Sequence, residues 1–138
     1  MIKAIIFDLD NTLLDFIKMK QFAVKAAITA MNEAGLHVDE DKAYQDIFDL
    51  YMEKGWENQL VFDDYLNQTT GEVSHKILAA GIVSYRRARE ATLLVYPNVN
   101  KTLIQLIKMG IKLAVVSDAP SREAWMRLYY LNLHHVFD

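Results

Sequence analysis

The sequence has 138 residues, enough for one ordinary domain or for a small core with an inserted helical module, but too few for two full domains. Its 52% apolar content and formal net charge of −3 are typical of a folded globular protein and argue against a disordered chain or a nucleic-acid-binding protein. Because the chain has no cysteine, disulfides, thiolate metal sites and a cysteine nucleophile are excluded.

The N-terminal segment predicts a strand that leads into acidic residues. Residues 3–7 form an isoleucine-rich apolar run that stops at Asp8 and Asp10. Such a run is typical of a buried parallel strand reaching its carboxyl end, where open α/β sheets place their functional residues. Acidic residues this close to the start exclude a signal-peptide core or a membrane span there, so we expect a cytoplasmic protein.

A long helical region follows the first strand. Apolar residues recur at three- and four-residue steps from about Phe16, and Gly35 suits the C-cap of this helix. A second helix is expected from Asp39, a suitable N-cap, to about Gly55. Shorter helices are expected after a break at Gly55 and again after Gly71, over residues 61–67 and 72–89.

The last part of the chain returns to regular α/β order. A helix opened by Pro97 is expected to end at Gly110. Residues 112–116 form a second apolar strand, which ends at Ser117, and a final helix is expected over residues 120–131. The order of strand, helical insert, helix, strand and helix predicts an α/β fold.

Asp8 and Asp10 are candidates for a metal site. Side chains two residues apart on an extended segment point the same way, and two crowded carboxylates repel each other unless a proton or a cation lies between them. Hard oxygen ligands are those that Mg²⁺ prefers, and substrate phosphate can complete its shell. The alternative is a pair of solvated acids in a turn. The apolar strand before the pair, and Asn11 and Thr12 after it, favour the magnesium site.

Three segments resemble the haloacid dehalogenase superfamily. Residues 7–14, FDLDNTLL, resemble its first motif, Asp-x-Asp-x-Thr after an apolar strand. Residues 115–118, VVSD, are similar to its second motif, a Ser or Thr at the end of the next core strand. Residues 96–99, with the helix up to Gly110, resemble the approach to that strand in the subfamily whose helical cap follows the first motif.

The resemblance implies a Rossmann-like parallel-sheet core, partial in this chain, with an inserted α-helical cap. The implied domains are the first strand and nucleophile motif at residues 1–15, the cap at residues 16–92, and the rest of the core at residues 93–138. Residues 16–92 match the family only as a helical cap of suitable size.

The resemblance also implies roles for the polar residues at the strand ends. Asp8 would attack phosphorus and become an aspartyl phosphate, and Asp10 would act as general acid and then general base. The Asp8 carboxylate and the Asp10 backbone carbonyl would hold Mg²⁺. Phosphate binding would fall to Ser117, Asp118 and Asn11. Since the dehalogenases of the superfamily lack an acid at the position of Asp10, dehalogenation is disfavoured.

Two further motifs of the family, a lysine and an acidic pair that completes the Mg²⁺ shell, have no counterpart here. No lysine follows Lys112. We therefore expect an N-terminal fragment of a longer enzyme, inactive as 138 residues, whose activity is hydrolysis of a small phosphorylated metabolite. A phosphomutase, and a non-catalytic binding protein with the same fold, are the alternatives. The physiological substrate and the oligomeric state are not predicted.

Two other groups have plainer interpretations. His134 and His135 could bind a metal, but an adjacent pair without a third ligand is more typical of a surface near a helix end. Arg86, Arg87 and Arg89 could steer a phosphorylated substrate, although a charge run of this kind is more typical of a solvated helix face.

Overall fold

The computed structural model describes residues 1–137 and divides the chain into two compact units. The first, which we call the core unit, contains Met1–Met19 and the chain from Leu93 onward. The second, the helical unit, contains Lys20–Thr92. Helix α1 (Phe16–Glu33) begins in the core unit and continues in the helical unit. The domain boundaries given by the family resemblance stay a prediction.

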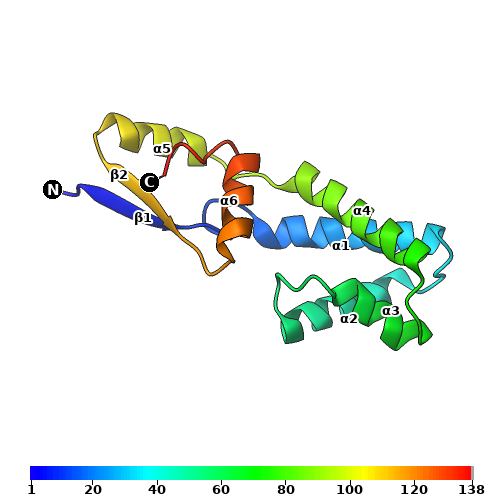
Figure 1. Cartoon of the computed structure of the whole chain (residues 1–138). Coiled ribbons are helices and arrows are strands. Elements are labelled where there is room, and N and C mark those ends of the chain that lie inside the picture. The colour runs from blue at the N-terminus through cyan, green and yellow to red at the C-terminus, as the bar shows by residue number, and fades with distance from the viewer. Residues whose placement is uncertain (138) are drawn as a thin grey trace. The chain divides into compact units, whose positions relative to one another are not determined.

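The core unit is built on a parallel pair of strands. Strand β1 (Ala4–Asp8) lies beside β2 (Lys112–Val116) (Figure 1), in a register that pairs each end of one strand with the same end of the other. Helix α5 (Val99–Lys108) precedes β2, and α6 (Ser121–Tyr130) follows it. This arrangement confirms the predicted α/β fold with a parallel sheet.

The two strands are less buried than their apolar sequences predict. Within residues 1–137 the sheet has only these two strands, so each has a free edge, and Ile6 and Val116 are 68% and 62% exposed. Leu113 is buried. Most of the core of this unit comes instead from the segments around the sheet. Its buried apolar residues include Leu9, Leu13, Leu14, Phe16, Leu103, Leu128 and Leu133.

The helical unit contains the rest of α1 together with α2 (Glu40–Lys54), α3 (Val61–Thr70) and α4 (His75–Thr92). Asp39 caps α2 as predicted, since its side chain accepts a hydrogen bond from the backbone N–H of Lys42 at 2.9 Å. One apolar cluster fills the unit, and its most buried members include Val24, Ile28, Met31, Ile47, Tyr65 and Leu66.

A buried lysine lies at the start of the helical unit. Lys20 is 4% exposed, and its Nζ donates hydrogen bonds to the Trp56 carbonyl at 2.8 Å and the Tyr85 hydroxyl at 2.6 Å. The same Nζ lies 3.9 Å from the centre of the Tyr51 ring, a cation–π contact. Burial raises the pKa of the Tyr51 phenol, and the neighbouring Tyr85 raises it further, so the ring next to Lys20 is neutral.

The helix before β2 begins later than the sequence predicts. Pro97 does not lie in the first turn of α5, because Asn98 adopts a left-handed conformation (φ 68°) as the N-cap and the helix starts at Val99. None of the helices within residues 1–137 has the length and hydropathy needed to cross a membrane. The cytoplasmic location stays a prediction.

The packing of the helical unit can be tested by substitutions at a buried and an exposed position of α2. Ile47 of α2 is fully buried, so Ile47→Ala should lower the free energy of unfolding by about 2–5 kcal/mol. Met52 lies on the same helix and is 74% exposed, so Met52→Ala should change it by less than about 0.5 kcal/mol. Urea denaturation of both variants measures the difference; equal effects would contradict this account of the core.

Candidate active site

Parallel pairing places the ends of the two strands at one edge of the sheet. Asp8, the last residue of β1, pairs with Val116, the last residue of β2, and Ser117 follows directly. Two residues far apart in the sequence, Asp8 and Ser117, therefore lie at neighbouring strand ends. This edge is where parallel sheets commonly carry their ligand sites.

The turn after β1 is held by a buried leucine. Leu9 is fully buried, and its carbonyl accepts hydrogen bonds from the backbone N–H groups of Thr12 and Leu13 at 3.3 and 2.9 Å. Side chains alternate along an extended segment, so with Leu9 buried Asp8 and Asp10 both point to the other side; Asp8 is exposed and Asp10 half-buried. The apolar residue of the motif thus positions its two acids.

Asp8 is exposed and carries local hydrogen bonds. Its Oδ1 accepts from the backbone N–H of Leu9 at 2.9 Å, and its Oδ2 lies 3.5 Å from the donating hydroxyl of Thr12. Each carboxylate oxygen has two lone pairs, so these bonds orient the group and still leave acceptor capacity. An exposed, oriented carboxylate is suited to attack an electrophile or bind a cation.

Asp10 forms an ion pair that the sequence did not predict. Its Oδ2 lies 2.7 Å from Nη1 of Arg127, a residue of α6, and the two side chains are 22% and 9% exposed. Crowded carboxylates need a nearby cation, and for Asp10 the fold supplies a guanidinium. One feature of the sequence indicated this contact. Arg127 is a charged residue next to Leu128, and both lie in the buried part of an amphipathic helix.

Asn11 lies at the entry to α1. It adopts a left-handed conformation (φ 60°), which asparagine tolerates better than most residues. Its Oδ1 accepts hydrogen bonds from the backbone N–H groups of Phe16 and Ile17 at 3.1 and 3.3 Å. Asn11 therefore satisfies the first turn of α1. A phosphate contact by Asn11 stays a prediction.

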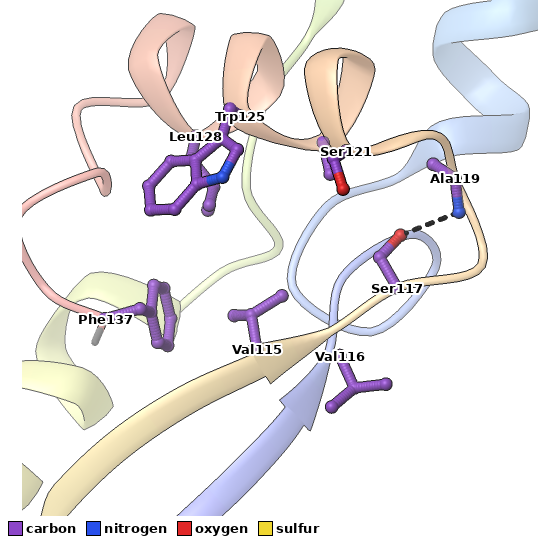
Figure 2. A pocket seen from close by; sticks show the side chains of 9 residues that line it. Val115, Val116, Ser117, Ala119, Ser121, Trp125, Leu128 and Phe137 are labelled. Carbon is purple, nitrogen blue, oxygen red and sulfur yellow. Dashed lines mark hydrogen bonds between the residues drawn. The ribbon is translucent and has the colours of Figure 1, made fainter.

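The segment after β2 supplies hydrogen-bond donors. Ser117 Oγ accepts from the backbone N–H of Ala119 at 3.1 Å, which leaves its hydroxyl proton for another acceptor (Figure 2). Asp118 is exposed; its ionised carboxylate could only accept hydrogen bonds, so contact with an anion would have to come from its backbone N–H. Both residues precede the N-terminus of α6, an end that favours anions.

A pocket of about 310 Å³ lies beside Ser117. Figure 2 shows the end of β2 and Ser121 on one part of its lining and the apolar side chains of Trp125, Leu128 and Phe137 on another. The polar end of this pocket is thus next to Ser117, whereas the rest of its lining is mainly apolar.

The residues at the edge of the sheet fit a magnesium ion. Within residues 1–137 no group of three or more histidine and acidic side chains forms a protein-only metal site. Mg²⁺ does not need one, because it commonly binds one or two carboxylates and completes its shell with water and substrate phosphate. The Asp8 carboxylate and the Asp10 carbonyl are hard oxygen donors of this kind, and their binding of Mg²⁺ stays a prediction. His134 is instead stacked on Tyr129, with ring centres 4.0 Å apart.

Known proteins resemble this chain along its whole length. The sequence model of the family described as "Hydrolase: haloacid dehalogenase-like hydrolase" matches residues 2–138. A glyceraldehyde 3-phosphate phosphatase from Methanocaldococcus jannaschii is 36% identical over 138 residues, all of this chain and 60% of that protein. One from Methanopyrus kandleri is 37% identical over 139 residues, 99% of this chain and 60% of that protein. The chain thus spans about 60% of the length of the curated relatives it matches.

Solved structures share the fold at lower sequence identity. A Thermotoga maritima protein, solved as a candidate β-phosphoglucomutase, superposes with a TM-score of 0.72 at 22% identity, over 99% of this chain and 59% of that one. An HAD phosphatase from Thermococcus onnurineus gives a TM-score of 0.61 at 19% identity, over 99% of this chain and 60% of that one. At these identities the likeness concerns the fold alone.

The capping role of Asn11 gives a prediction about stability. Asn11→Ala removes the acceptor for the first turn of α1, so it should lower the free energy of unfolding by about 0.5–2 kcal/mol. Asn11→Asp keeps a side-chain oxygen at the same place and should retain most of that stability. Chemical denaturation of the two variants distinguishes them, and equal losses would show that the hydrogen bonds to Phe16 and Ile17 do not matter.

Proposed function

The chain belongs to the haloacid dehalogenase-like hydrolases, and we propose that the protein is a Mg²⁺-dependent phosphatase with Asp8 as its nucleophile. The observation that carries this proposal is the pairing of β1 with β2, which brings Asp8 and Ser117 to neighbouring strand ends. A nucleophilic carboxylate and a hydroxyl donor are two of the groups that transfer of a phosphoryl group to the protein uses.

In the proposed reaction, an oxygen of Asp8 forms a bond to phosphorus while the bond from phosphorus to the ester oxygen breaks. The leaving alkoxide takes the bonding electrons and a proton from Asp10. A water molecule, which gives its proton back to Asp10, then attacks phosphorus and releases phosphate and the free Asp8 carboxylate. Two easier displacements replace one difficult displacement.

The other groups at this edge reduce the cost of bringing two anions together. Bound to the Asp8 carboxylate and the Asp10 carbonyl, Mg²⁺ would supply charge neutralisation between nucleophile and phosphate. The Ser117 hydroxyl would donate to a phosphoryl oxygen, since its own bond with Ala119 uses it only as an acceptor. The N-terminus of α6 would add backbone donors.

The relatives suggest a substrate class. Both named relatives are glyceraldehyde 3-phosphate phosphatases, and their alignments with this chain cover the helical unit as well as the core unit. We therefore propose a three-carbon phosphate ester bearing an aldehyde as substrate, with the helical unit acting as a cap in substrate choice.

The role of Asp8 is testable in the longest form of the protein that its gene encodes. Asp8→Asn should abolish Mg²⁺-dependent release of phosphate from p-nitrophenyl phosphate, because an amide cannot form the intermediate. Its thermal unfolding should match that of the wild type, since Asp8 is exposed and Asn can keep the bond from Leu9. Retained turnover would refute Asp8 as nucleophile. The 138-residue chain, verified by intact mass, should itself be inactive. Robust turnover by this chain would contradict the hypothesis that it is a fragment of a longer enzyme.

The substrate class and the metal are tested together. Phosphate release should be faster from glyceraldehyde 3-phosphate than from glycerol 3-phosphate, judged by kcat/KM, since the two differ mainly at the carbonyl. Removal of metal with EDTA should stop both reactions, and added Mg²⁺ should restore them. Equal kcat/KM values would overturn the aldehyde preference, and activity in EDTA would overturn the metal requirement. A product that stays phosphorylated would point to a phosphomutase.

A further inference from the structure

The contact between Asp10 and Arg127 joins the turn after β1 to α6. The two residues are separated by 117 positions in the sequence, and their side chains approach to 2.7 Å. Arg127 is one of two buried residues of α6, with Leu128, whereas most of that helix is exposed or half-buried. A buried guanidinium is retained only where it is paired and hydrogen-bonded.

Arg127 is itself held in place on a second side. Its guanidinium carbon lies 4.9 Å from the centre of the Phe16 ring, and Phe16 is 5% exposed. The guanidinium thus lies over an aromatic face while it donates to a carboxylate, a combination that lysine cannot reproduce fully. Asp10 is therefore bonded to a group that has little freedom to move.

Orientation matters for the role proposed for Asp10. A general acid must come within hydrogen-bond reach of the atom it protonates, and a misplacement of about 1 Å can cost on the order of 10²-fold in rate. The Asp10 side chain has two rotatable bonds, and the bond from Arg127 restricts both. The bond is made to Asp10, whereas Asp8 is bonded to Leu9 and Thr12, so it acts on the acid and not on the nucleophile.

We propose that Arg127 is a positioning residue, which acts on phosphoryl transfer through Asp10; this inference rests on the proposed function. Arg127 holds the Asp10 carboxyl group through Oδ2, in the orientation in which its other oxygen delivers the proton to the leaving-group oxygen. Direct contact of Arg127 with substrate is not part of the proposal, because its side chain is 9% exposed and donates to Asp10.

The test is a double-mutant cycle in the longest natural form of the protein, assayed with p-nitrophenyl phosphate and Mg²⁺. Arg127→Met should lower kcat by about 10- to 100-fold with KM changed less than about threefold, and Arg127→Lys should recover part of kcat. In an Asp10→Asn background, Arg127→Met should cause no further loss, because the group it positions is already gone. Lys108→Met, at an exposed basic position at the end of α5, should match the wild type.

The outcomes distinguish the positioning role of Arg127 from the proposed phosphatase function. The positioning role would be overturned if Arg127→Met lowered kcat by the same factor in the wild-type and Asp10→Asn backgrounds. Unchanged kcat in a folded Arg127→Met variant would overturn it as well. If Arg127→Met does not fold by circular dichroism, Arg127→Gln, which keeps hydrogen-bond donors, replaces it in the same cycle. Turnover by the wild type that is lost in Asp8→Asn supports the proposed function, whatever the effect of the Arg127 variants. Absence of turnover by the wild type would overturn both the proposed function and the positioning role.

Discussion

The parallel pairing of β1 with β2 is the interaction on which the candidate site depends. It joins Asp8 to Val116 across most of the chain and so sets Ser117 beside the end of β1. The entropic cost of closing so long a loop grows only slowly with its length. Moreover, the intervening Lys20–Thr92 segment has its own apolar core, so little of the separation is flexible chain. The pairing is thereby compatible with a large helical insertion.

Two charged side chains, Arg127 and Lys20, are buried in the structure, and each is stabilised by its neighbours. Arg127 lies between Asp10 and the Phe16 ring, and Lys20 lies among the aromatic side chains of the helical unit. In both cases hydrogen bonds and a ring face replace the water that the cation loses on folding. The two cations differ in position, however. Only Arg127 is bonded to a residue of the acidic segment that follows β1, which is why it bears on the proposed chemistry.

Much of the local structure could be predicted from sequence because its causes are local. The apolar runs before Asp8 and Ser117 predicted both strands, and Asp39 marked the start of α2 through its capping side chain. The start of α5 was misplaced, because the left-handed Asn98, and not the proline before it, forms the cap. The exposure of the sheet was also missed, because an apolar run indicates a strand but not how much of it neighbouring elements cover.

The sequence was enough to infer the α/β order of elements and the polar residues that end each strand, because side-chain periodicity and capping act over a few residues. It also determined the family, through the motif at Asp8 and Asp10. The pairing of Asp10 with Arg127 and the capping of α1 by Asn11 become evident in the folded chain alone. Those partners depend on where α6 packs and how the turn after β1 bends, and long-range packing of this kind leaves no periodic signal in one sequence.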